Sequence, residues 1–250
     1  MTAAPDWLVA RPIAHRGLHA ASRGVPENTL AAAEAAIAGG FAIECDVQLS
    51  RDGEAMVFHD HTLDRLTTER GPVRERDAAT LGRLDIGGTC ERIPTLRAFL
   101  DRIAGRTPVI LEIKSRFDGD ERLAQRTAAI LAEGEAPVVV KSFDPAIVSL
   151  MRRIAPKLAR GVVAQSRYEG GEWDRLDETR RRAMANLLHW GDTQPDFLSW
   201  QHRDLPNAAT TLPRLLAGIP VMAWTIRSPD EAGIVRPHVD QIVFEGFVPA

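Results

Sequence analysis

Eight short apolar runs, most of them rich in β-branched residues, recur along the chain and limit what it can fold into. They centre on Ile13, Ile43, Val109-Ile110, Val138-Val140, Val162-Val163, Phe197-Leu198, Val221-Met222 and Ile242-Val243. Most are separated by segments with helical periodicity, and this alternation favours parallel strands joined by helices. Eight strand–helix units in 250 residues match the size of a TIM (β/α)8 barrel. The sequence therefore predicts an α/β protein with this fold.

Local signals support three of the intervening helices. An alanine-rich segment, residues 29–38, is followed by Gly39, which can end a helix. Between the third and fourth runs, apolar residues line one helical face of residues 123–131. After the fourth run, Asp144 and Pro145 supply an N-cap and a first-turn proline. Each of these helices follows a predicted strand, as the barrel requires.

One interval between neighbouring runs is longer than the others. Ile43 and Ile110 are about 67 residues apart, whereas most neighbouring runs are separated by roughly 20 to 36 residues. We interpret the excess, residues 62–94, as a small insertion at the barrel mouth that acts as a partial lid within a single domain spanning residues 1–250. A doubly wound open sheet is the competing architecture. It is disfavoured because no G-x-G-x-x-G turn follows the first run.

Composition and charge exclude several classes of protein. The net charge of −3 argues against a broad basic surface for nucleic acid or anionic lipid. The two cysteines form no C-x-x-C pair, which disfavours a disulfide framework and a thiolate zinc site. The N-terminus lacks the pattern of a secretory signal, and no apolar segment approaches 18 residues. We therefore expect a cytoplasmic protein that binds neither nucleic acid nor, stably, a membrane.

Two carboxylates and a histidine are predicted to converge at the second strand. Glu44 and Asp46 stand two residues apart, so in an extended chain both point to one face. Residues 50–53 read as a hairpin turn. A chain reversal there brings His59 back beside the two carboxylates.

Further polar residues follow the first and third runs. In a TIM barrel the reacting groups lie at the C-terminal strand ends, where His15, Arg16, Glu112 and Lys114 fall. Three carboxylates (Glu44, Asp46 and Glu112) without a thiolate favour one divalent cation, Mg²⁺ or Ca²⁺. Arg16 and Lys114 beside that cation indicate an anionic substrate, best a phosphate. His15 and His59 would then serve as general acid and base.

Plainer interpretations stay open for these residues. Glu44 and Asp46 could form ion pairs with Arg16 and Lys114 without any metal. Trp200 and Trp224, near later strand ends, could belong to the core or to a wall of the substrate pocket.

Taken together, the motifs resemble those of the glycerophosphodiester phosphodiesterases along nearly the whole chain. The opening pattern comprises His15-Arg16-Gly17, Pro26-Glu27-Asn28-Thr29, Glu44-x-Asp46-Val47, Asp52-Gly53 and His59-Asp60. It continues with Leu63-Asp64-Arg65-x-Thr67, Pro94-Thr95-Leu96, Glu112-Ile113-Lys114, Ser142-Phe143 and Ala223-Trp224-Thr225. No fragment is specific alone, but the ordered combination is.

The resemblance implies a TIM-barrel phosphodiesterase acting on a small-molecule diester, with Glu44, Asp46 and Glu112 as metal ligands. It implies that His15 and His59 are the acid–base pair and that Arg16 and Lys114 hold the phosphate; Phe143 joins the pocket candidates. In the implied mechanism, the glycerol hydroxyl of the substrate attacks phosphorus and water then opens a cyclic phosphate.

The chain departs from the family pattern at two late strand ends. Glu245 stands where the family usually has Thr-Asp, and Arg227 stands where an asparagine is common. We expect Glu245 to orient His15 or Arg16 without being a metal ligand. Alternatives to the implied activity are a phospholipase D-like or phosphoinositide-cleaving enzyme, and a binding protein that has lost turnover. The polar insertion weakly favours small soluble diesters, and the intact histidine pair and ligand set argue against a binding protein.

Overall fold

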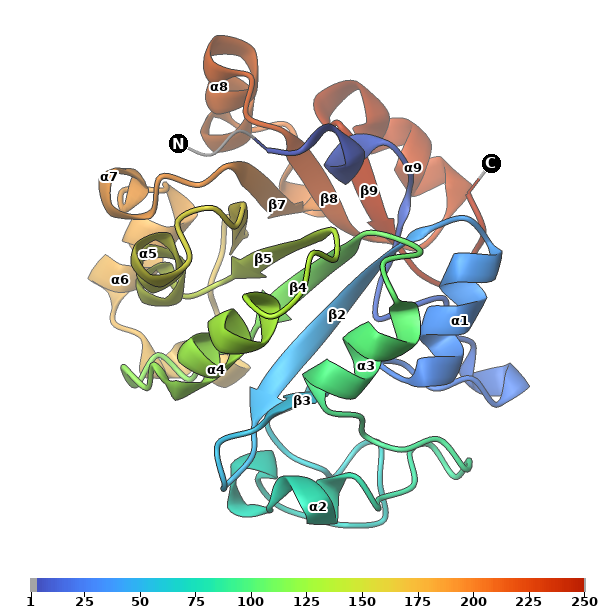
Figure 1. The fold of residues 1–250 in the computed structure, drawn as a ribbon. Coiled ribbons are helices and arrows are strands. Elements are labelled where there is room, and N and C mark those ends of the chain that lie inside the picture. The colour runs from blue at the N-terminus through green and yellow to red at the C-terminus, as the bar shows by residue number, and fades with distance from the viewer. Residues whose placement is uncertain (1–3, 250) are drawn as a thin grey trace. The chain divides into compact units, whose positions relative to one another are not determined.

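The computed structural model describes residues 4–249, which form two compact units that interleave along the sequence. The first unit comprises residues 13–114 and 121–138, and the second comprises residues 4–12, 115–120 and 139–249. Figure 1 labels most of their helices and strands. Each unit is described by itself below.

The first unit is built around a long central strand, β2 (Ala42–Leu49). Two strands pair with β2 in parallel, β1 (Ile13–Ala14) and β4 (Val109–Ile113). The third, β3 (Ala55–Val57), pairs with it antiparallel. The helices are α1 (Leu30–Ala38), α2 (Ala78–Leu81), α3 (Leu96–Ile103) and α4 (Arg122–Leu131). Helices α1, α3 and α4 pack against these strands (Figure 1).

Both faces of β2 are buried. Because successive side chains of a strand point to opposite faces, apolar residues lie on one face and carboxylates on the other. Ile43, Cys45 and Val47 are fully buried on one face, where each large aliphatic side chain contributes about 1.5–3 kcal/mol by leaving water. Glu44 and Asp46 occupy the other face and are each only 1% exposed. This strand therefore anchors the core and also presents two carboxylates.

The predicted hairpin is confirmed. The Gly53 N–H donates to the Ser50 carbonyl, Gly53 has a φ of +85°, and the Ser50 N–H donates to the Glu54 carbonyl. The Ser50 hydroxyl also donates to Asp52 Oδ1 at 2.6 Å. The resulting register pairs Val47 with Val57.

Residues 62–94 contain η3 (Val73–Glu75) and α2. Apolar side chains of this segment form a small buried cluster with Met56 of β3. Its fully buried members include Phe58, Leu63, Leu81 and Ile86. This cluster explains how a segment rich in polar residues is held in place. The lid role remains a prediction.

The second unit contains five strands that pair in chain order, all parallel. They are β5 (Val138–Ser142), β6 (Arg160–Ala164), β7 (Phe197–Gln201), β8 (Val221–Ile226) and β9 (Gln241–Phe244). The helices are α5 (Pro145–Ile154), α6 (Glu178–Ala185), α7 (Trp190–Thr193), α8 (Ala208–Ala217) and α9 (Pro229–Val235). Within the described residues, the eight predicted runs therefore all lie in strands, and β3 is the added hairpin partner.

The helix signals in the sequence are also confirmed. Thr29 caps α1 by accepting from the Ala32 N–H, and the helix ends at Gly39. Asp144 caps α5 by accepting from the Ala146 N–H, and Pro145 occupies the first turn. Helix α4 covers the stripe predicted over 123–131.

Candidate active site

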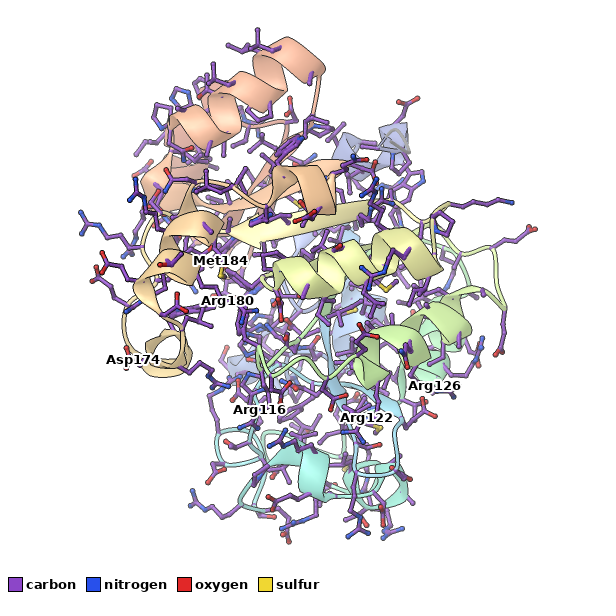
Figure 2. The ribbon with its side chains drawn as sticks, turned by 90° about the vertical axis from the view of Figure 1, so that its left-hand side faces the viewer. Arg116, Arg122, Arg126, Asp174, Arg180 and Met184 are labelled. Atoms are coloured by element: carbon purple, nitrogen blue, oxygen red, sulfur yellow. The ribbon has the colours of Figure 1, made fainter. Side chains whose placement is uncertain are left out.

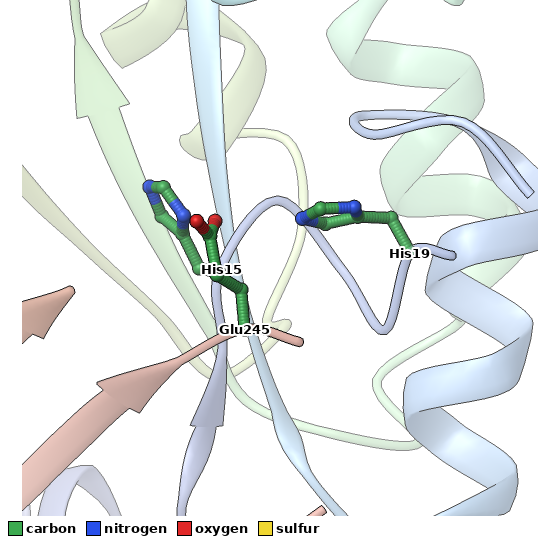
Figure 3. Close-up of side chains that lie close together, drawn as sticks. All are labelled: His15, His19 and Glu245. Carbon is green, nitrogen blue, oxygen red and sulfur yellow. The ribbon is translucent and has the colours of Figure 1, made fainter. Parts of the chain in front are cut away.

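The turn after β1 brings His15 and Arg16 to Glu44. Arg16 and Gly17 have φ values of +55° and +77°, and a Cβ on Gly17 would lie 2.8 Å from the Ala32 Cβ. Only glycine fits there without strain. Glu44 accepts twice from this turn, from the Arg16 N–H at Oε2 and from the Gly17 N–H at its carbonyl. His15 Nε2 lies 4.0 Å from Glu44 Oε2, and Figure 3 shows His15 and His19 on the loop that leaves β1.

Three buried carboxylates meet on neighbouring parallel strands. The register of β2 and β4 places Asp46 beside Glu112, and Glu44 precedes Asp46 on the same face. Each of the three residues offers one oxygen, and these oxygens all lie within 4.8 Å of one another. Glu44 and Asp46 are each 1% exposed and Glu112 is 5% exposed, so all three are shielded from bulk water. An oxygen-only cluster of this size suits a hard divalent cation.

Two cationic side chains balance this negative charge. Lys114 Nζ lies 2.8 Å from Asp46 Oδ1 and 2.5 Å from Glu112 Oε1, and Arg16 Nε lies 3.7 Å from Asp46 Oδ2. Burial acts to raise the pKa of Asp46, but Lys114, His59 and Arg16 outweigh it and hold that pKa well below its ordinary value. Burial acts to lower the pKa of Lys114, yet Asp46 and Glu112 raise it. Asp46 and Lys114 are therefore both charged at neutral pH.

Asn28 holds Asp46 from a second side. It is buried with a φ of +56°, its Nδ2 donates to Asp46 Oδ2 at 3.0 Å, and its Oδ1 accepts from the Asp46 N–H at 3.2 Å. Asparagine tolerates this left-handed backbone better than most residues. Asn28 belongs to one of the sequence motifs, but the spacing of that motif does not predict this contact with Asp46.

The hairpin places His59 beside the same carboxylates. The Phe58 N–H donates to the Asp46 carbonyl, and Gln48 Nε2 donates to the His59 carbonyl at 2.9 Å. The His59 ring contacts the next residue, with Nδ1 2.7 Å from Asp60 Oδ1. When Nδ1 carries the proton and donates to Asp60, Nε2 is left as the proton-exchanging atom. The structure thus brings together His15, Arg16, Glu44, Asp46, His59, Glu112 and Lys114, all within the first unit.

Sequence reasoning gave no role to Glu27, Asp60 and Arg65. Arg65 bridges the two carboxylates, Glu27 also pairs with Arg16, and Asp60 also pairs with His59. All three lie in the family motifs, but the spacing of those motifs does not show which side chains meet.

The remaining predicted residues lie at strand ends of the second unit and are mostly aromatic. Phe143 contacts Trp224 edge to face, with ring centroids 5.5 Å apart, and Trp173 packs on Phe143. Trp224 Nε1 donates to the Ser199 carbonyl. Trp200 is fully buried and belongs to the core of its unit. Pocket roles for these residues remain predictions.

The two departures from the family pattern pair with each other. Arg227 Nη2 lies 2.7 Å from Glu245 Oε1. Elsewhere in the same unit, Arg180 on α6 donates to the Phe117 carbonyl and lies over the Phe117 ring, and Arg175 donates to the Arg116 carbonyl. Figure 2 labels Arg180 and Arg116. The expected role of Glu245 in orienting His15 or Arg16 remains a prediction.

Comparison with solved structures identifies the class of fold. A phosphodiesterase from Oleispira antarctica, solved in complex with the product sn-glycerol-3-phosphate, matches with a TM-score of 0.78 and 25% identity, covering 96% of this chain and 95% of that chain. A glycerophosphodiester phosphodiesterase from Agrobacterium tumefaciens str. C58 matches with a TM-score of 0.69 and 26% identity, covering 93% and 94%. The chain has the TIM (β/α)8 barrel fold, as its eight apolar runs predict.

Sequence comparison then gives the family. The model of the Glycerophosphoryl diester phosphodiesterase family matches residues 15–243. The "Putative glycerophosphodiester phosphodiesterase YhdW" of Bacillus subtilis (strain 168) is 28% identical, over 94% of this chain and 97% of that protein. The chain therefore belongs to the glycerophosphoryl diester phosphodiesterase family and is a phosphoric diester hydrolase. Within residues 4–249, no helix combines the length and apolarity needed to cross a membrane.

Proposed function

We propose that this enzyme hydrolyses glycerophosphodiesters to glycerol phosphate and an alcohol, using one divalent cation and the pair His15 and His59. The observation that carries the proposal is the convergence, in one unit, of an oxygen-only acidic cluster, two cations and two histidines. The product seen in the Oleispira antarctica relative supports glycerol phosphate as the product class.

The donor set fits a Mg²⁺ or Ca²⁺ ion. Glu44, Asp46 and Glu112 supply only carboxylate oxygens, which these hard cations prefer. Because its pKa is lowered, Asp46 stays ionised and can serve as a metal ligand even though it is buried. A bound cation would neutralise non-bridging phosphate oxygens and make the attacking hydroxyl more acidic.

The side chains around the cluster supply the remaining chemistry. Arg16 and Lys114 remain charged in a buried environment, so they can hold the phosphate of a diester. One histidine takes the proton of the attacking glycerol hydroxyl as its oxygen bonds to phosphorus, and the other protonates the leaving alcohol as its bond to phosphorus breaks. Water then opens the resulting cyclic phosphate to give glycerol phosphate. The contact between Nδ1 and Asp60 lets His59 exchange its proton at Nε2.

A panel of diesters tests the proposal and its alternative together. Glycerol phosphate esters of choline, ethanolamine, inositol and glycerol are assayed beside a phospholipid and a phosphoinositide, after chelation and with each metal restored. We expect turnover of the small glycerol diesters that depends on Mg²⁺ or Ca²⁺. Turnover confined to the lipids would support the phospholipase-like alternative, and full activity without metal would contradict the proposed ligand set.

A further inference from the structure

Arg65 joins two carboxylates through all three of its guanidinium nitrogens. Its Nε and Nη2 donate to the two Asp60 oxygens at 2.7 and 2.9 Å. Its Nη1 and Nη2 donate to the two Glu27 oxygens at 2.9 and 2.8 Å. Two bidentate contacts from one planar fork are a geometry that lysine cannot reproduce.

Each of these carboxylates also contacts a residue of the candidate active site. Asp60 Oδ1 lies 2.7 Å from His59 Nδ1, and Glu27 Oε1 accepts from Arg16 Nη1 at 2.6 Å. The five side chains therefore form one continuous chain, with Arg65 at its centre. Arg65 is thereby linked to the His59 ring through Asp60 and to the Arg16 guanidinium through Glu27.

The ion pairs of this five-residue network keep Glu27 and Asp60 ionised although both are partly buried. Burial acts to raise the pKa of Glu27, but Arg65 and Arg16 lower it overall. Burial likewise opposes ionisation of Asp60, and His59 and Arg65 reverse that effect so that the pKa falls. The side chains of Glu27 and Asp60 are 11% and 22% exposed, whereas that of Arg65 is 46% exposed. The two carboxylates are thus mostly buried, and the more exposed Arg65 side chain links them.

We propose that Arg65 is a positioning residue, which fixes the His59 ring through Asp60 and the Arg16 guanidinium through Glu27. The inference rests on the proposed function, because His59 and Arg16 matter to catalysis only if they act as described there. A fixed Asp60 keeps the proton of His59 on Nδ1, and a fixed Glu27 keeps Arg16 aimed at the phosphate. One side chain therefore orients both a proton-transfer group and a phosphate-binding group.

Kinetics of two Arg65 variants test this role against a purely stabilising one. Arg65→Met removes the fork, and Arg65→Lys keeps the charge but not the two bidentate contacts. We expect kcat to fall by about 10–100-fold in Arg65→Met, the range typical of lost orienting partners, and less in Arg65→Lys. The pH profile of kcat should shift, and KM should rise as Arg16 loosens.

Arg70→Met is the matched control. Arg70 lies in the same segment, its side chain is 80% exposed, and its ion pair is with Asp64 at 3.7 Å. We expect wild-type kcat, KM and pH profile from this variant. Thermal melting of all variants shows whether the folded fraction at the assay temperature is unchanged. Kinetic losses that match only a loss of folded protein, or that are equal in Arg65→Met and Arg70→Met, would overturn the proposal.

A double-mutant cycle tests the route through Asp60. If Arg65 acts through that carboxylate, Arg65→Met should lower kcat much less in an Asp60→Asn background than in the wild type. The same cycle with Glu27→Gln should reduce the effect on KM. Full additivity in both cycles would contradict the proposed route.

A spectroscopic readout separates this inference from the proposed function. Nitrogen NMR of ¹⁵N-labelled histidine, with Mg²⁺ present and no substrate, reports the His59 tautomer. The wild type should show Nδ1 protonated, and Arg65→Met should show a mixed population while Arg70→Met does not. If the wild type turned over no diester, the proposed function would fail, but this change would still support Arg65 as the positioning residue. An unchanged His59 signal in Arg65→Met would overturn the inference whatever the activity.

Discussion

The strand ends of the two units carry opposite kinds of chemistry. On or directly after β1, β2 and β4 in the first unit lie histidines, carboxylates and cations joined by ion pairs. On or directly after β5 and β8 in the second unit lie Phe143 and Trp224, which pack on other aromatic rings. We therefore expect the reaction to depend on side chains of the first unit, and the second unit to contribute mainly apolar contacts.

This comparison also shows how each kind of strand end is stabilised. Buried charges are costly unless they are paired, and each carboxylate of the acidic cluster has a nearby cation or N–H donor. The aromatic rings instead gain from edge-to-face packing and from the hydrogen bond of Trp224 Nε1. Substitutions in the first unit should therefore alter turnover strongly, and those in the second should alter it less.

Loss of either histidine should give the largest effect. We expect His15→Ala and His59→Ala each to lower kcat by about 10²–10⁴-fold, as for a lost general acid or base. Thermal stability should change little. Steady-state assays with a diester that has a poor leaving group make the measurement. Near-normal turnover by one variant would remove that histidine from the mechanism.

Lys114→Ala should lower diester hydrolysis by about 10²-fold, because the proposed contact of its ammonium with the phosphate is lost. Calorimetric titration of the metal then separates two roles. Unchanged metal affinity with lost activity supports phosphate binding. Weaker metal affinity with a normal KM would show instead that the ion pairs of Lys114 with Asp46 and Glu112 tune the ligands.

The carboxylates of the first unit should make its stability sensitive to acid. The pKa values of Glu27 and Asp60 are lowered in the folded protein. Such groups stabilise the fold above their unfolded pKa of about 4, and this contribution is lost as the pH falls through the folded pKa. The free energy of unfolding, measured in urea, should therefore fall below about pH 4.

Glu27→Gln should show a smaller acid-induced loss than the wild type, because one of these carboxylates is removed. Glu135→Gln, which alters an exposed carboxylate of the same unit, is the control and should follow the wild type. An identical pH dependence in all three proteins would show that the pairing of Glu27 does not contribute.

The smallest effect is expected at the ion pair of the second unit. The Arg227 side chain is 57% exposed, so its pair with Glu245 should contribute less than about 1 kcal/mol to stability. Glu245→Gln should leave metal affinity unchanged and lower kcat modestly with a shifted pH profile, if Glu245 orients His15 or Arg16. Unchanged kcat and pH profile would show that the carboxylate serves only its pair with Arg227.

The sequence predicted the strands, the hairpin and the converging charged residues because these follow from local periodicity. Residues two apart on a strand share a face, and the turn at 50–53 determines where His59 returns. The contacts of Arg65 could not be predicted in this way. They join Glu27 and Asp60, 38 and 5 residues away, through loops whose paths no periodicity describes.

The same limit applies to the late strand ends. The departures at Arg227 and Glu245 could be recognised from the family pattern, but their mutual ion pair depends on where two loops pass each other. Trp200 shows a related ambiguity, since a tryptophan near a strand end suits the core or a pocket equally. Its complete burial places it in the core of its unit.

The central claim is that Glu44, Asp46 and Glu112 together hold one divalent cation that turnover requires. Calorimetric titration of the 250-residue chain with Mg²⁺ and with Ca²⁺, after its metal has been removed by chelation, tests the claim directly. Glu112→Gln is titrated in parallel, and activity is followed at each point. We predict one bound ion per wild-type chain, turnover that rises with occupancy, and loss of both in the variant. Full activity after exhaustive chelation, or unchanged metal binding by Glu112→Gln, would contradict the claim.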